Sequence, residues 1–312
     1  MTTLRCCSAY RNPKIIFNAS PTYRLIWICA LLMLTLALHA QDTHFILSNT
    51  HIIKLTSELT GRDHELIIFL PDNYQNSPEE EYPTLYFMDA YWDMPLLNSI
   101  HGQLVYDKVI PELIMVGFSY PGENVNYGDL RARDLTPTRE KGYNPASGEA
   151  PLFLQFIEET VIPFIETEYR ADPNERALSG SSLGGLFTLY SMYEKPLLFK
   201  RFIAISPAAE WDNRVIFKYD DDFASENESL PVRLFLSQGS DEYPPFRQGI
   251  VAFQKKIADR HYQNLALLNY TIEGERHSGV KSDGYSRGLR WVFKDIAPTS
   301  PSGLAESYSH DP

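Results

Sequence analysis

Cysteine is nearly absent from this sequence, which has only three in 312 residues. Cys6, Cys7 and Cys29 all fall within the first 40 residues, a segment with the pattern of a leader. A chain without that segment has no thiol, which excludes disulfides, cysteine metal sites and a cysteine nucleophile. Burial of an apolar core must then supply the stability, and about 270 residues are enough to form one.

Acidic residues are also missing from the start of the chain, since the first is Asp42. The charged side chains before it are all basic: Arg5, Arg11, Lys14 and Arg24. An apolar stretch follows over residues 25–38, shorter than the ~20 residues of a membrane-spanning helix. This order is typical of a secretory signal peptide. We expect residues 1–40 to be that signal peptide and the mature protein to be exported, to the periplasm or outside the cell; an uncleaved N-terminal membrane anchor is the alternative.

A basic surface is the third feature that the sequence lacks. The chain has 28 Lys and Arg against 40 Asp and Glu, a net charge of −12. Loss of the four leader cations leaves 24 against 40, a net charge of −16. Such a surface repels phosphates and argues against a nucleic-acid partner. The chain also has no Gly-x-Gly-x-x-Gly, phosphate loop or His-Glu-x-x-His motif, so we expect no cofactor and no metal site.

Short apolar runs alternate with amphipathic stretches along the rest of the chain. We expect a hairpin of strands 52–55 and 65–70, and later strands at 83–88, 113–118, 177–179, 201–206, 231–237 and 265–272. Helices are expected at 96–105, 152–169, 246–258 and 286–293. This alternation predicts an α/β fold, in which helices cover both faces of a mainly parallel sheet after an N-terminal antiparallel hairpin. One domain over residues 41–297 and a disordered Pro/Ser-rich tail over 298–312 complete the expected organisation.

Two segments between the expected strands and helices have unusual compositions: one is rich in aromatic residues and the other is long and polar. Residues 89–93 are expected to form an aromatic-rich loop, which is either an ordinary surface loop or the source of an oxyanion amide from Tyr91, with Trp92 as second choice. We also expect Trp92 to contact substrate. Residues 120–150 are expected to form a long polar loop, functional or a lid. Within it, Arg131 and Arg133 could bind acidic groups of a substrate or hold the loop by ion pairs, and the second interpretation is favoured.

The sequence Gly-x-Ser-x-Gly at residues 180–184 lies between a strand-like run and an apolar helix. By itself this motif is weak evidence for an active site, because an ordinary glycine-rich turn can have the same sequence. Its context is that of a nucleophile elbow, where Gly180 and Gly184 leave room for closely packed backbone. The first amides of the following helix can stabilise an oxyanion. Ser182 is therefore the candidate nucleophile.

Partners for this serine occur later in the chain in the order acid, then histidine. His277 follows the last expected strand and is the candidate base. Glu242 and Asp241 both follow the strand before it, and Glu242 is favoured because it takes the fourth position of its turn. Asp212 is a remote third choice. The order Ser, acid, His, each at the carboxyl end of a strand, is more specific than the serine motif alone.

Several further segments match one family. The chain resembles the putative-esterase family of α/β-hydrolases, which includes esterase D-like proteins, ferric enterochelin and salmochelin esterases and antigen 85-type mycolyltransferases. The resemblance covers residues 48–296 and rests on six motifs: Leu70–Tyr74, Tyr86–Ala90, Arg131–Pro137, Gly180–Gly185, Ile205–Pro207 and Gly274–Ser278. It implies an α/β-hydrolase fold, with Ser182 as nucleophile, His277 as base and the Leu183 amide as one oxyanion donor. Ala90 departs from the glycine that the family often has there.

These observations predict an exported carboxylic-ester hydrolase that forms an acyl-enzyme on Ser182. An acyltransferase with the same triad is one alternative. A catalytically silent protein that binds a ligand such as a siderophore is another. The expected partner is a small-molecule ester, and no stable membrane insertion is expected after cleavage of the signal. The sequence has no signature of oligomeric state.

Overall fold

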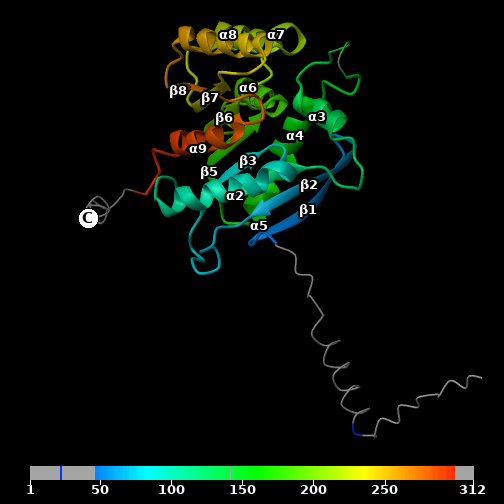
Figure 1. Cartoon of the computed structure of the whole chain (residues 1–312), viewed down its shortest axis with the longest axis vertical. Coiled ribbons are helices and arrows are strands. Elements are labelled where there is room, and N and C mark those ends of the chain that lie inside the picture. Colours follow the sequence, from blue (N-terminus) through cyan, green and yellow to red (C-terminus); the bar gives the residue numbers. More distant parts are fainter. Residues whose placement is uncertain (1–21, 23–45, 141, 143, 299–312) are drawn as a thin grey trace, which may run out of the picture. The chain divides into compact units, whose positions relative to one another are not determined.

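The computed structural model describes residues 46–140, 142 and 144–298, together with Thr22. The chain divides into two units, Met1–Ile46 and Leu47–Pro312, and all the labelled helices and strands belong to the second (Figure 1). Apart from Thr22, the expected signal peptide over 1–40 lies outside the described residues, as does the expected tail after residue 298. In the described part of the chain, no helix is both long enough and apolar enough to cross a bilayer.

A single eight-stranded sheet with the order β1-β2-β4-β3-β5-β6-β7-β8 forms the centre of the second unit (Figure 1). β1 pairs antiparallel with β2, and β2 pairs antiparallel with β4, while the other neighbours are parallel. This confirms the predicted α/β-hydrolase arrangement of a mainly parallel sheet after an N-terminal hairpin. The strands are β1 (Thr50–Ser57), β2 (Arg62–Phe69), β3 (Tyr82–Phe87), β4 (Ile114–Ser119), β5 (Ala171–Ser181), β6 (Arg201–Ile205), β7 (Arg233–Gly239) and β8 (Ala266–Ile272).

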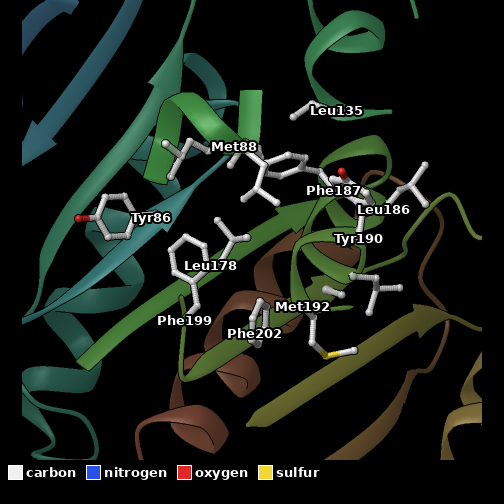
Figure 2. Close-up of a cluster of buried hydrophobic side chains, with 14 of the residues drawn as sticks. Tyr86, Met88, Leu135, Leu178, Leu186, Phe187, Tyr190, Met192, Phe199 and Phe202 are labelled. Carbon is white, nitrogen blue, oxygen red and sulfur yellow. The ribbon is translucent and has the colours of Figure 1, made fainter. Parts of the chain in front are cut away.

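Helices cover both faces of the sheet. One face packs against α2 (Ala90–Tyr106) and α9 (Val280–Val292), with Phe87, Ile203 and Tyr285 in the core between them. The other face packs against the remaining helices: α3 (Tyr127–Leu135), α4 (Ala150–Phe156), the π-helix η1 (Ile157–Val161), α5 (Ile162–Glu168), α6 (Leu183–Glu194), α7 (Trp211–Glu226) and α8 (Pro244–Arg260). Figure 2 shows Phe187 of α6 in this second core. Central strands such as β4 and β6 are buried along their whole length because both faces are covered.

The strand register places the carboxyl ends of the parallel strands in a row. Ser181 of β5 lies opposite Ile205 of β6, and Ile205 lies opposite Ser237 of β7. On the next pair of strands, Gly239 of β7 lies opposite Ile272 of β8. The segments that follow β5, β6, β7 and β8 therefore emerge at the same edge of the sheet, where ligands bind in open α/β sheets.

Two sequence expectations about local structure were wrong, and a third needs a correction of detail. Residues 89–93 are not a loop, because Asp89 adopts a left-handed conformation (φ 62°, ψ 37°) and α2 begins at Ala90. The segment 120–150 is not without structure, because α3 forms in its middle and the Asn126 side chain caps it by accepting from the Asp129 amide. The helix expected over 152–169 does form, over residues 150–168, but its middle is the π-helix η1, which ends two residues before Pro163, a residue without an amide donor.

Candidate active site

Ser182 occupies a strained turn between β5 and α6. Its backbone has φ 60° and ψ −119°, a region that residues with a side chain rarely adopt. Hydrogen bonds hold the residue on both sides: its amide donates to the Ile205 carbonyl at 3.0 Å, and its carbonyl accepts from the Ala208 amide at 3.0 Å. A strained residue that its surroundings hold this firmly is a common feature of functional sites.

The two glycines of the elbow allow a close backbone approach. A Cβ on Gly180 would collide with the carbonyl of Gly184, so no larger residue fits without a backbone shift. A Cβ on Gly184 would lie 3.1 Å from the Cβ of Met88, at the end of β3. The turn around Ser182 is thus packed directly against the segment that leads into α2.

Two amides are the candidate oxyanion donors, one at the start of α6 and one at the start of α2. Leu183 is the first residue of α6, and its amide belongs to the first helical turn, which has no intrahelical acceptors. The amide of Trp92 donates to the Asp89 carbonyl at 3.0 Å and is therefore occupied. Tyr91, one residue earlier in the first turn of α2, remains the candidate for the second amide.

Glu242 is the acidic side chain that lies against His277. Its carboxylate is fully buried, and its Oε2 lies 3.7 Å from the Nδ1 of His277. The other oxygen, Oε1, accepts hydrogen bonds from the Ser206 hydroxyl and from the Gly239 amide. Burial opposes ionisation of this group, but the interactions with His277, Ser206 and Gly239 outweigh it and lower the pKa of Glu242. Glu242 is held as an anion with one oxygen directed at the imidazole.

The other two candidate acids are placed differently. Asp241 is exposed, and its carboxylate accepts from the neighbouring Ser240 hydroxyl at 3.0 Å. Asp212 lies in the first turn of α7, within three consecutive residues of left-handed backbone. Among the described residues, the carboxylate that forms an ion pair with His277 is that of Glu242 and not that of Asp241 or Asp212.

His277 lies on the turn between β8 and α9. The Asp241 amide donates to the Glu275 carbonyl at 3.0 Å, which joins the Glu242 turn to the His277 turn. Phe246 of α8 packs edge-on against the imidazole, with 4.7 Å between the ring centroids. Because His277 is half-exposed, the other side of its ring is accessible from solvent. The strand register brings this turn to the same edge of the sheet as Ser182.

Arg131 and Arg133 are both engaged in ion pairs. The Arg131 guanidinium donates to both oxygens of Asp89, at 2.6 and 2.9 Å. Arg133 lies 3.6 Å from a carboxylate oxygen of Glu149. These contacts tie α3 and the segment after it to the rest of the domain. They are the contacts expected if the two arginines hold the segment in place.

Exposed aromatic side chains gather beside the start of α2. Tyr91 and Trp92 are 62% and 50% exposed, and their ring centroids are 6.1 Å apart. Tyr127, the first residue of α3, contacts both, at 5.8 and 5.1 Å. We call Tyr91, Trp92 and Tyr127 the aromatic cluster. It lies next to Asp89 and hence near the elbow, and it includes the residue predicted to contact substrate, Trp92.

Two residues at this edge escaped the sequence reasoning. Ser206, directly after β6, also has a left-handed backbone (φ 43°) and bonds Glu242. Glu210 follows four residues later, and burial raises its pKa to about 7. The sequence could have indicated both residues, because both follow the buried strand β6, and residues after the carboxyl end of such a strand lie near the ligand site.

The chain is similar to several known proteins. A family model described as "Putative esterase" matches residues 57–279. The chain is 28% identical to the ferri-bacillibactin esterase BesA of Bacillus subtilis, over 81% of this chain and 93% of that protein. It is 30% identical to a siderophore triacetylfusarinine C esterase of Aspergillus fumigatus, over 58% of this chain and 71% of that protein.

The fold is also similar to that of solved structures. The crystal structure of a protein named BES from Bacillus cereus superposes with a TM-score of 0.73 at 27% identity, over 81% of this chain and 98% of that one. An IroE-like serine hydrolase from Shewanella oneidensis superposes with a TM-score of 0.71 at 25% identity, over 80% and 81% of the two chains.

Proposed function

The chain belongs to the putative esterase family and is a carboxylic-ester hydrolase, and we propose that it is an exported serine esterase with Ser182 as nucleophile, His277 as general base and Glu242 as the acid. Export rests on the pattern of residues 1–40 in the sequence. The triad rests on the geometry at the carboxyl edge of the sheet.

The contact between Glu242 and His277 is the observation that carries this proposal. Oε1 of Glu242 is occupied by Ser206 and Gly239, so Oε2 is the oxygen that faces Nδ1 of the imidazole. A proton on Nδ1 leaves the other ring nitrogen, Nε2, free to accept the proton of the Ser182 hydroxyl. The buried carboxylate then stabilises the imidazolium that forms.

The reaction proceeds through two acyl-transfer steps. The Ser182 oxygen attacks the ester carbonyl while its proton passes to His277, and a tetrahedral oxyanion forms. The amide of Leu183, with that of Tyr91 as second donor, stabilises this charge. His277 then protonates the departing alcohol, and the acyl group stays on Ser182. Water, deprotonated by His277, releases the acid and restores the serine.

The proposed substrates are esters of the siderophore type. The similar proteins from Bacillus subtilis and Aspergillus fumigatus are named for ferri-bacillibactin and triacetylfusarinine C. In this chain, the aromatic cluster supplies two exposed rings, Tyr91 and Trp92, and the partly buried ring of Tyr127 near the elbow, and a planar group of such a substrate can stack on them. Cleavage of a siderophore ester at this site would separate its metal-binding arms.

Substitution of the serine tests the proposal. Ser182→Ala is expected to lose at least about 10³-fold in turnover of p-nitrophenyl butyrate and of a siderophore ester, since a nucleophile acts as one unit with its base. Ser181→Ala is the matched control, because Ser181 is the preceding residue and is buried in β5. A fluorophosphonate should label the wild type and the control but not Ser182→Ala. Undiminished turnover by Ser182→Ala would reject the mechanism.

Product analysis separates hydrolysis from transfer. With an added sugar or lipid alcohol, the proposal predicts the free acid as the main product, whereas an acyltransferase would form the new ester. A silent binding protein would give neither product and no fluorophosphonate label.

A further inference from the structure

A third carboxylate lies at the edge of the sheet that holds the proposed triad. Glu210 ends the connection from β6 to α7. This connection also contains Ser206, whose hydroxyl donates to Glu242, and Ala208, whose amide donates to the Ser182 carbonyl at 3.0 Å. Glu210 is thus joined, through a few residues of hydrogen-bonded backbone, to both the nucleophile and the acid.

Helix α8 places Glu210 beside His277. Phe246 of α8 packs against the imidazole of His277, with 4.7 Å between the ring centroids. Gly249 is three residues later, and a Cβ at that position would lie 3.3 Å from the Oε2 of Glu210. Residues three apart on a helix lie on one face, about 5–6 Å from each other. The same face of α8 therefore contacts both His277 and Glu210.

The proposed mechanism does not use Glu210, although burial of its carboxylate costs folding free energy. Its Oε2 is buried and has no hydrogen-bond partner in the described part of the chain. A carboxylate oxygen in such a place loses hydration, and no hydrogen bond to that oxygen replaces it. A buried titratable group with a shifted pKa, at an edge where ligands bind, is a candidate functional residue.

We propose that Glu210 is a second carboxylate partner of His277, acting beside Glu242 on the charged form of the imidazole. The inference rests on the proposed triad. Glu210 is a positioning and electrostatic residue here, since Glu242 is the group that faces Nδ1 directly. Its negative charge, once formed, stabilises the imidazolium of the transition state across the low-dielectric site.

The charges around Glu210 set the pH at which it can act. Burial raises its pKa to about 7 and Glu242 adds to this shift, while its own backbone amide, His277 and Arg214 oppose it. Two other arginines belong to segments that pack against the Glu210 segment: Arg247, two residues before Gly249 on α8, and Arg139, next to the Thr138 carbonyl that accepts from the Trp211 indole. Below pH 7 Glu210 is mainly neutral, and above it Glu210 is mainly an anion. Its help to His277 should therefore appear only on the alkaline side.

The test is the pH profile of kcat/KM for Glu210→Gln, with p-nitrophenyl butyrate as substrate. Glutamine resembles the neutral acid, so the variant should match the wild type at pH 5.5 to 6. At pH 8 and above it should be about threefold to tenfold slower, the effect of losing a charge interaction equal to roughly 0.5–1 pH unit. The rise in activity with pH should then follow one ionisation instead of two coupled ones.

Three further variants make the result decisive. Glu210→Asp keeps the charge and should retain the second ionisation. Glu112→Gln is the matched control, because burial also raises the pKa of Glu112 but this residue precedes β4 at the opposite edge. In a Glu242→Gln background, Glu210→Gln should cost more at pH 8 than it does alone, because the two carboxylates support the same imidazolium.

Two different failures can be told apart. If the Glu210→Gln profile superimposes on that of the wild type while Ser182→Ala is inactive, this inference is wrong and the triad stands. If Ser182→Ala keeps its activity, the proposed function itself is wrong. An equal loss at every pH, including pH 5.5, would mean that Glu210 is only structural and would also overturn the inference.

Discussion

The Nδ1 of His277 and the Oε2 of Glu242 lie 3.7 Å apart, with the carboxylate fully buried and the imidazole half-exposed. This separation is longer than a hydrogen bond, as is frequent in catalytic sites without substrate, where such contacts tighten on binding. The acid is held from the other side by Ser206 and Gly239. A small movement of the His277 turn is therefore enough to close the contact.

The choice between the two neighbouring acids follows from this geometry. Glu242→Gln should lower kcat by about 10²- to 10⁴-fold, since the imidazolium loses its buried counter-charge. Asp241→Asn, the adjacent exposed carboxylate, should stay within about twofold of the wild type, as surface changes usually do. Measurement of kcat for both variants checks the assignment, and a larger loss in Asp241→Asn would reverse it.

The aromatic cluster predicts a change confined to substrate binding. Trp92→Ala should raise KM for an aryl-bearing siderophore ester by about 2- to 10-fold with kcat unchanged, because ring contacts are worth roughly 0.5–1.5 kcal/mol. Ethyl butyrate, which has no ring, should be cleaved as before. Tyr106→Ala is the control, since Tyr106 is exposed at the far end of the same helix. Equal KM changes in both variants would remove the cluster from substrate binding.

Much of the fold could be predicted because its strands are apolar runs and its turns contain glycine. The central strands, buried on both faces, appear in the sequence as nearly continuous hydrophobic segments such as 201–206. The nucleophile elbow could also be predicted from the sequence, because the close backbone approach at position 180 admits only glycine. These features depend on local sequence and on the period of the strand.

Other features could not be predicted because tertiary contacts determine them. The segment around Arg131 forms a helix where its side chain reaches Asp89, 42 positions earlier in the sequence. Helix α7 escaped prediction because it begins with left-handed Asp212, Asn213 and Arg214 and then runs into a charged stretch. The buried carboxylate of Glu210 escaped because α8, which packs over it, lies much later in the chain.

The ion pair between Arg131 and Asp89 predicts a loss of stability. Arg131→Ala should lower the free energy of unfolding by about 3 kcal/mol or more, since it leaves Asp89 buried without its bidentate partner. Arg133→Ala should cost less than about 1 kcal/mol, because Arg133 is more exposed and its contact with Glu149 is longer. Urea unfolding monitored by circular dichroism measures both. If Arg131 instead bound anionic substrate, Arg131→Ala would raise KM at unchanged stability.

The identity of the residue that carries the acyl group decides the central claim most directly. The protein can be mixed with p-nitrophenyl butyrate, quenched in acid within milliseconds and digested, and the peptides examined by mass spectrometry. The account predicts a butyryl group on Ser182 alone, absent from Ser182→Ala and formed far more slowly in His277→Ala. A butyryl group on another residue, or full turnover with no acyl-enzyme on Ser182, would contradict it.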